Sequence, residues 1–225
     1  MHDFLTERGL REASEISLVM PLGVPIRPSP AASDAVLAAF VERDITWCAE
    51  RLVRALDPAR NVALLSDGSE MAYDLFLGVP VHRAPAVAVE SGLTVDCWIP
   101  VDPMTLETSP PGVYAEGDET SVGTPKAGVF AEGQAAVVAD AIIGRMRGTS
   151  VLAPYDGHVK CCLEFGHDQV ARVDVTFRTG DHPTGFMDGP SQELVADKKE
   201  FGSSRITTLV RSHRGQREDV SASSS

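Results

Sequence analysis

The segment from residue 111 to residue 147 constrains the fold of this chain more than any other part of the sequence. Val113–Ala115 predicts a short strand that ends at Gly117 and Asp118. A loop rich in Gly, Thr and Pro follows, and the apolar spacing after it predicts a long helix over Val129–Arg147. Ligands of open α/β sheets bind at strand ends, and anions bind at helix N-termini. The segment therefore predicts an α/β fold with a ligand site between the strand end and the helix.

The residues before this segment alternate between helical and strand patterns, as nucleotide-binding α/β units do. The expected elements are a helix over 1–11, a buried strand over 16–20, a proline-rich loop over 21–30, a helix over 35–43 capped by Ser33 or Asp34, strands over 44–47, 51–56 and 61–65, and a buried strand over 73–79. The strand over 73–79 is the strongest of this half, and residues 82–92 are expected to form a loop.

The last third of the chain changes to antiparallel β patterns. Residues 160–165 and 170–177 predict two strands joined by a turn over 166–169, and residues 191–198 predict a helix. Residues 98–100 form a further expected short strand. Beyond Ser212 the sequence is polar and serine-rich, which is typical of a frayed tail.

The charge balance excludes several classes of function. Among 225 residues, 20 are basic and 32 acidic, which gives a net charge of −12. Nucleic acid and anionic lipid are therefore not expected as partners. No run of about 18 apolar residues occurs, so no transmembrane segment is expected, and the charged start does not resemble a secretory signal. Cytoplasm is the default compartment.

The side chains between the predicted strand and helix suit a polar, partly anionic ligand. Gly117 permits close approach of a ligand to the backbone, and Asp118 can accept a hydrogen bond from a sugar or ribityl hydroxyl. Lys126 adds a positive charge near free amide groups at the helix start. The expected cofactor-binding residues are Gly117, Asp118, Thr124, Pro125, Lys126, Ala127 and Gly128. The alternative is that Gly117 and Asp118 form a plain turn and Lys126 is a solvated charge.

The segment VYAEGD…TPKAGVFAEGQ resembles the second flavin-binding motif of two-dinucleotide-domain flavoproteins. The closest look-alikes are sulfide:quinone oxidoreductases and flavocytochrome c sulfide dehydrogenases, in the pyridine nucleotide-disulfide oxidoreductase superfamily. The resemblance extends to YDLFLGVP at 73–80, to 156–166 and to KEFG at 199–202. It implies FAD as cofactor, with Asp118 on the ribityl chain and Lys126 near the pyrimidine edge of the flavin.

The same resemblance implies a redox role for Cys161 on the predicted strand over 160–165. Cys162 follows it directly, and strand alternation allows only one of the pair to face the flavin. His158 and Lys160 supply positive charge that would lower a thiol pKa. The alternative is that both cysteines are small buried hydrophobes. Cys48 and Cys97 are expected to be structural or incidental, and no spacing of histidines or cysteines predicts a metal site.

The chain departs from the family pattern because it lacks one of the expected FAD-binding motifs. No GxGxxG motif, which would clasp the ADP half of FAD, occurs in this chain. The expectation is an incomplete Rossmann-like flavoprotein: residues 1–95 as part of a second, NAD(P)-type dinucleotide-binding domain, 96–150 as the C-terminal part of an FAD-binding domain, 151–212 as a C-terminal capping or dimerisation segment, and 213–225 as a disordered tail.

Three functions remain open on this basis. The first is an FAD-dependent oxidoreductase of the sulfide dehydrogenase or sulfide:quinone oxidoreductase type, with a small-molecule electron donor, sulfide or NAD(P)H, and an unknown acceptor. The second is a non-catalytic fragment or split-enzyme subunit, either a homo-oligomer or a partner of a chain that supplies the N-terminal FAD half. The third is an NAD(P)H-dependent flavoprotein reductase. His82 could line a substrate path, although a polar loop residue is the simpler interpretation.

Overall fold

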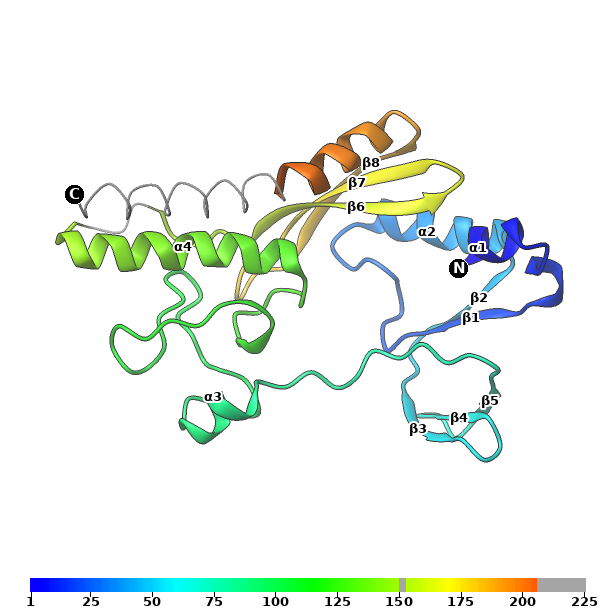
Figure 1. The fold of residues 1–225 in the computed structure, drawn as a ribbon, viewed down its shortest axis with the longest axis horizontal. Helices are drawn as coiled ribbons and strands as arrows, with labels where there is room; N and C mark the ends of the chain where they lie inside the picture. Colours follow the sequence, from blue (N-terminus) through cyan, green and yellow to red (C-terminus); the bar gives the residue numbers. More distant parts are fainter. Residues whose placement is uncertain (150–152, 206–225) are drawn as a thin grey trace, which may run out of the picture.

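Three separate β-sheets follow one another along the chain in the computed structural model, which describes residues 1–149 and 153–205. In Figure 1 the first sheet lies at the right, with the second sheet below it and the third above it, and a long helix runs at the left below the level of the third sheet. The mixture of parallel and antiparallel sheets with covering helices confirms the α/β class that the sequence predicts.

The first sheet is a β-α-β unit. Strand β1 (Ile16–Val19) pairs in parallel with β2 (Ile45–Cys48), and helix α2 (Pro30–Glu42) connects them. Phe40 of the helix lies against Trp47 of the strand, with ring centroids 6.0 Å apart. A short helix α1 (His2–Glu7) and a 3-10 turn η1 (Arg11–Ala13) precede the unit.

Helix α2 begins five residues earlier than expected. The side chain of Ser29, not Ser33 or Asp34, accepts the hydrogen bond of the Ala32 amide at 3.3 Å, and Pro30 occupies the first helical position. Proline is favoured there because its missing N–H would have no helical partner. The Ser33 hydroxyl instead holds the preceding loop through both backbone groups of Ile26.

The second sheet is a three-stranded antiparallel meander of β3 (Val53–Asp57), β4 (Val62–Leu65) and β5 (Glu70–Ala72). The hairpin expected over 51–65 is confirmed. The buried strand expected over 73–79 is wrong. Leu77 and Val79 are 74% and 85% exposed, and the segment runs as an extended trace towards α3 (Figure 1). An apolar run becomes a buried strand only when a neighbouring strand pairs with it, and none does among the described residues.

The region between the meander and the long helix consists mostly of turns. Helix α3 (Ala86–Glu90) lies where a loop was expected, and the 3-10 turn η2 (Gly117–Glu119) contains the predicted strand end. The strands expected over 98–100 and 113–115 are reduced to isolated bridges, of Ile99 with Thr120 and of Tyr114 with Glu107. The short apolar runs here pair with single residues rather than with full strands.

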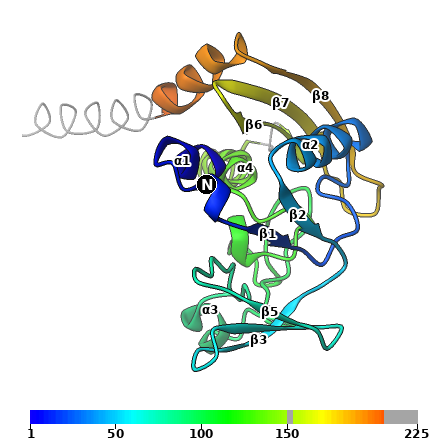
Figure 2. The ribbon, with the colours of Figure 1, turned by 90° about the vertical axis from the view of Figure 1, so that its right-hand side faces the viewer.

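The largest core lies between α4 (Gly128–Arg147) and the third sheet, β6 (His158–Gly166), β7 (Gln169–Thr176) and β8 (Thr184–Ser191). The sheet is antiparallel in that order, and Figure 2 shows α4 along one face of it. Four buried side chains form the contact: Phe130, Val159, Val173 and Val175. Helix α4 and strands β6 and β7 match their predicted bounds closely, and Gly148 ends the helix in the left-handed conformation.

Strand β8 was not expected, because its glycines and Pro190 interrupt the apolar alternation. Helical structure begins at residue 194 rather than 191 and continues to 205. The tail expected beyond Ser212 lies outside the described residues. In the described part of the chain, no helix is long and apolar enough to cross a membrane. The proposed division into domains stays a prediction.

Candidate functional site

A pocket of about 670 Å³ lies between the segment 81–83, the turn η2 and the start of α4. Its volume falls in the range of small-molecule sites. The residues that line it are Val81, His82, Arg83, Glu116, Gly117, Asp118, Glu119, Gly128 and Ala131. Of the residues expected to bind cofactor, Gly117, Asp118 and Gly128 therefore line one pocket, although residues 120–127 separate the turn from the helix.

Gly117 allows the turn to approach the helix. Its φ of +80° lies in the region that favours glycine, and a Cβ placed on it would lie 3.5 Å from the Cβ of Ala131. The amide of Gly117 donates a 2.7 Å hydrogen bond to Oε1 of Gln134, one helical turn further along α4. The backbone next to Asp118 is therefore tied to the helix that forms the opposite wall.

Gln134 connects three segments in the interior beside the pocket. Its side chain is 1% exposed, accepts from Gly117, and donates to the Thr124 hydroxyl at 3.2 Å and to the Tyr155 hydroxyl at 3.4 Å. Thr124 is itself buried, so its role is to hold the loop rather than to face the pocket. Burial raises the pKa of Tyr155, while its hydrogen bonds to Gln134 and Thr124 oppose that shift.

The start of α4 provides hydrogen-bond donors at the pocket wall. Ala127 occupies the N-cap position but forms no side-chain cap, and its carbonyl accepts from the amides of Phe130 and Ala131. A helix N-terminus without a side-chain cap leaves amide groups of its first turn available and carries a partial positive charge. Since Gly128 lines the pocket, an anionic or strongly polar ligand group is favoured at this end.

Lys126 is not one of the pocket-lining residues. Its Nζ donates to the Thr120 carbonyl and lies 4.4 Å from the centroid of the Trp98 ring. Burial lowers the pKa of Lys126, and the nearby charge of Asp118 opposes that shift. The lysine therefore supports the loop under the pocket, while exposed Pro125 lies at the loop surface.

Acidic side chains give the pocket its electrostatic character. Glu116, Asp118 and Glu119 all line it, and Oε2 of Glu116 is buried without a hydrogen-bond partner among the described residues. Burial raises the pKa of the Glu116 carboxyl, and the negative charges of Glu119 and Asp118 raise it further. A ligand hydroxyl that donates to this oxygen would relieve an unfavourable buried acceptor.

The raised pKa predicts that Glu116→Gln stabilises the protein at neutral pH. The folded chain holds this proton more tightly than the unfolded chain, so stability falls as pH rises from the ordinary glutamate pKa of about 4.3. A glutamine does not titrate and escapes that loss. We expect a gain at pH 7 that vanishes below pH ~4 in urea unfolding, and solvent screening of this partly buried group keeps the gain small. Exposed Glu193→Gln is the control, and an equal gain in both variants would refute the assignment.

Cys161 lies on the face of β6 that packs towards α4. It contacts the apolar cluster around Phe130, as do Ala127 and Val129 at the helix start. Burial raises the pKa of the Cys161 thiol, and Cys162 adds to the shift. The positive charges expected to lower it lie elsewhere, because His158 and Lys160 are exposed and pair with Asp174, at 2.7 and 3.8 Å.

Sequence reasoning missed the two residues that organise the site, Gln134 and Tyr155. The hydrogen-bond partners of Gln134 come from three other segments, so the residues around it in the sequence do not indicate its role. The sequence did contain one signal for the pocket wall, because His82 follows an apolar run. The structure places His82 and Arg83 at the pocket, and the substrate-path interpretation of His82 stays a prediction.

Comparison with known proteins finds similarity in structure only. No protein-family model and no curated protein sequence matches the chain. The sulfide:quinone oxidoreductase from the hyperthermophilic bacterium Aquifex aeolicus superimposes with a TM-score of 0.68 at 18% identity, covering 89% of this chain and 52% of that one. A ferredoxin reductase from Rhodopseudomonas palustris gives 0.55 at 22%, covering 75% and 43%. A chain of the mitochondrial ATP synthase from Tetrahymena thermophila gives 0.59 at 19%, covering 76% and 43%.

These matches define the class of fold. The chain has the fold of the pyridine nucleotide-disulfide oxidoreductases, as the sequence resemblance implies. It spans between 31% and 52% of the length of the solved structures to which it is similar.

Proposed function

We propose that this chain forms the flavin half of an FAD site in an oxidoreductase. The observation that carries the proposal is the Gln134 hydrogen bond to Gly117, which ties the turn of Asp118 to the uncapped start of α4 across one pocket. The pocket combines carboxylate acceptors, which suit ribityl hydroxyls, with the amide donors of a helix start. Among the solved structures of this fold are a sulfide:quinone oxidoreductase and a ferredoxin reductase.

The residues present fit the group. The unpartnered Oε2 of Glu116 and the carboxylate of Asp118 would accept hydrogen bonds from the ribityl chain, and the first turn of α4 would lie beside the end of the flavin ring that gains negative charge. When bound, the flavin supplies the electron-transfer chemistry. The protein would orient it through Gln134 and exclude water on the side covered by α4.

Flavin binding by the purified chain tests this proposal. After incubation with FAD and gel filtration, we expect the protein peak to show the visible absorbance of bound flavin. FMN should compete with FAD for binding. ADP should compete weakly, because no GxGxxG motif occurs in this chain. A chain that binds neither FAD nor FMN, or one from which ADP displaces FAD as well as FMN does, would overturn the assignment.

The sulfide dehydrogenase or sulfide:quinone oxidoreductase type is our proposal for the reaction. It is supported by the fold match that covers most of this chain and by Cys161, which packs on the same apolar cluster as the start of α4. If it is correct, sulfide should bleach the bound flavin in stopped-flow mixing faster than NADH does. Cys161→Ser should slow the sulfide reaction and leave the flavin content unchanged, whereas Cys97→Ser should change neither.

A second candidate, a subunit that docks to a partner chain, is favoured by the segment 74–83. Leu75, Leu77, Val79 and Val81 all expose most of their side chains on an extended backbone. Such a row of apolar groups is unusual on a soluble monomer and is a suitable edge for strand addition. Light scattering with an apolar dye tests it: association or strong dye binding is expected, and a monodisperse monomer that binds no dye would count against it.

A further inference from the structure

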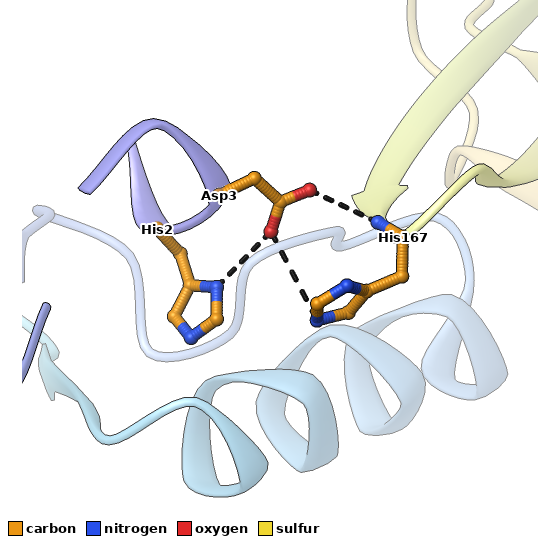
Figure 3. Close-up of side chains that lie close together, drawn as sticks. All are labelled: His2, Asp3 and His167. Atoms are coloured by element: carbon orange, nitrogen blue, oxygen red, sulfur yellow. Dashed lines mark hydrogen bonds and ion pairs between the residues drawn. The ribbon is translucent and has the colours of Figure 1, made fainter. Parts of the chain in front are cut away.

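Two histidines and an aspartate from distant parts of the chain meet in a cluster that shares no residue with the pocket described above. His2 and Asp3 lie on helix α1, and His167 lies in the tight turn between β6 and β7 (Figure 3). One ligand atom from each residue falls within 4.8 Å of the other two. Asp3 and His167 are 164 residues apart along the chain.

The carboxylate of Asp3 lies between the two imidazoles. Its Oδ1 is 3.1 Å from Nδ1 of His2 and 4.0 Å from Nε2 of His167, while Oδ2 accepts the backbone amide of His167 at 2.9 Å. Hydrogen bonds from His2 and from the His167 amide lower the pKa of Asp3, as do the charges of both histidines. Asp3 therefore has one oxygen held by the backbone of the turn and the other directed at two ring nitrogens.

The conformation of the turn between β6 and β7 places His167 beside Asp3. His167 and Asp168 both have positive φ, 51° and 54°, a conformation that is uncommon for residues other than glycine. Gly166 has a φ of +75°, which favours glycine, and a Cβ there would lie 2.6 Å from Oδ2 of Asp3 and displace the carboxylate from its present position.

We propose that His2, Asp3 and His167 bind a divalent transition-metal ion of the Zn²⁺ class. Imidazole and carboxylate are its usual ligands, and bonds of about 2.0–2.1 Å in tetrahedral geometry place ligand atoms about 3.4 Å apart. Two of the three ligand-atom distances, 3.1 and 4.0 Å, bracket that value, and all three atoms lie within 4.8 Å of one another. His167 is well exposed, so its ring can rotate inwards. The fourth position faces solvent and takes water.

The ion would fasten α1 to the third sheet. Helix α1 has six residues and none of them is buried, so packing holds it weakly. A metal that binds only where the fold brings these distant residues together stabilises the folded chain by its binding free energy. Metal binding by this cluster is independent of the proposed flavin site, so the inference stands whether or not the chain binds flavin. The spacing of the histidines in the sequence does not predict it.

The experiment is a titration of the metal-free, tag-free protein with Zn²⁺ by isothermal calorimetry, with Mg²⁺ as the ion that should not bind. One Zn²⁺ per chain is expected, together with a higher Tm. Co²⁺ should give visible bands of tetrahedral type without the charge-transfer band of a cobalt–thiolate bond, which separates this site from the cysteines. Asp3→Asn and His167→Asn should each weaken binding at least tenfold.

Asparagine is chosen at position 167 because it tolerates positive φ, so the turn is kept while the imidazole is lost. His182→Asn, on an exposed loop, is the matched control and should bind Zn²⁺ as the unaltered chain does. Far-ultraviolet circular dichroism establishes that each variant is folded. Zn²⁺ affinity unchanged in both Asp3→Asn and His167→Asn, or a thiolate band with Co²⁺, would overturn the proposal.

Discussion

Replacing Phe130 by alanine is expected to lower the free energy of unfolding by about 3–5 kcal/mol. Phe130 is 4% exposed and is the aromatic member of the cluster between α4 and the third sheet. Its ring meets that of Phe177 edge to face, with centroids 5.6 Å apart. Alanine removes the apolar contact area and leaves a cavity that a helix docked on a sheet cannot close. Urea unfolding followed by circular dichroism measures the loss.

The same sheet offers a matched control. Phe186 on β8 is largely exposed, so Phe186→Ala should change the stability by no more than about 0.5 kcal/mol. Phe130→Leu should recover most of the loss, because it keeps an apolar side chain of similar volume. Equal effects at positions 130 and 186 would mean that α4 does not rest on the third sheet as described. In that case the start of α4 would no longer be fixed beside Asp118.

Local patterns predicted the elements that supply this core. Helix α4 is long enough for the spacing of its apolar residues to predict a helix. Gly148 ends it in the left-handed conformation, which glycine adopts readily. Strands β6 and β7 were predicted because each has apolar residues that alternate or follow one another over several positions, and a turn sequence at 166–169 lies between them. The fold class and three pocket residues, Gly117, Asp118 and Gly128, follow from the same order of strand end, loop and helix.

What the sequence could not predict depends on contacts between distant segments. The run over 73–79 has the composition of a buried strand, but a strand requires a neighbour, and composition does not say whether one exists. The positive charges of His158 and Lys160 stand next to Cys161 in the sequence, yet alternation along β6 turns them to the other face, where Asp174 pairs with them. Adjacent residues on a strand do not share surroundings.

The proposed metal-binding cluster of His2, Asp3 and His167 is a second case in which contacts between distant segments could not be predicted from the sequence. Its members are neighbours only because α1 lies against the turn of β6 and β7, and no spacing rule relates positions 2, 3 and 167. The expectation of no metal site rested on local motifs alone. The proposed site rests instead on three-dimensional proximity, with a carboxylate between two imidazoles.

Gln134→Met is expected to affect both stability and flavin binding. Methionine matches glutamine in length but neither accepts from the Gly117 amide nor donates to Thr124 and Tyr155. Buried polar groups left without partners cost about 1–3 kcal/mol, and we expect a loss of about 2–3 kcal/mol in urea unfolding. The turn that carries Asp118 would then lose its tie to α4.

If Gln134 positions the flavin site, the dissociation constant for FAD should rise at least tenfold in Gln134→Met at a temperature where the variant is fully folded. Gln134→Glu tests the position further, because a carboxylate still accepts from Gly117 and from both hydroxyls, and it should recover part of the affinity. Exposed Gln192→Met should leave stability and binding unchanged. Destabilisation with unaltered FAD affinity would restrict Gln134 to a structural role, since a positioning residue must change the binding of the group that it positions.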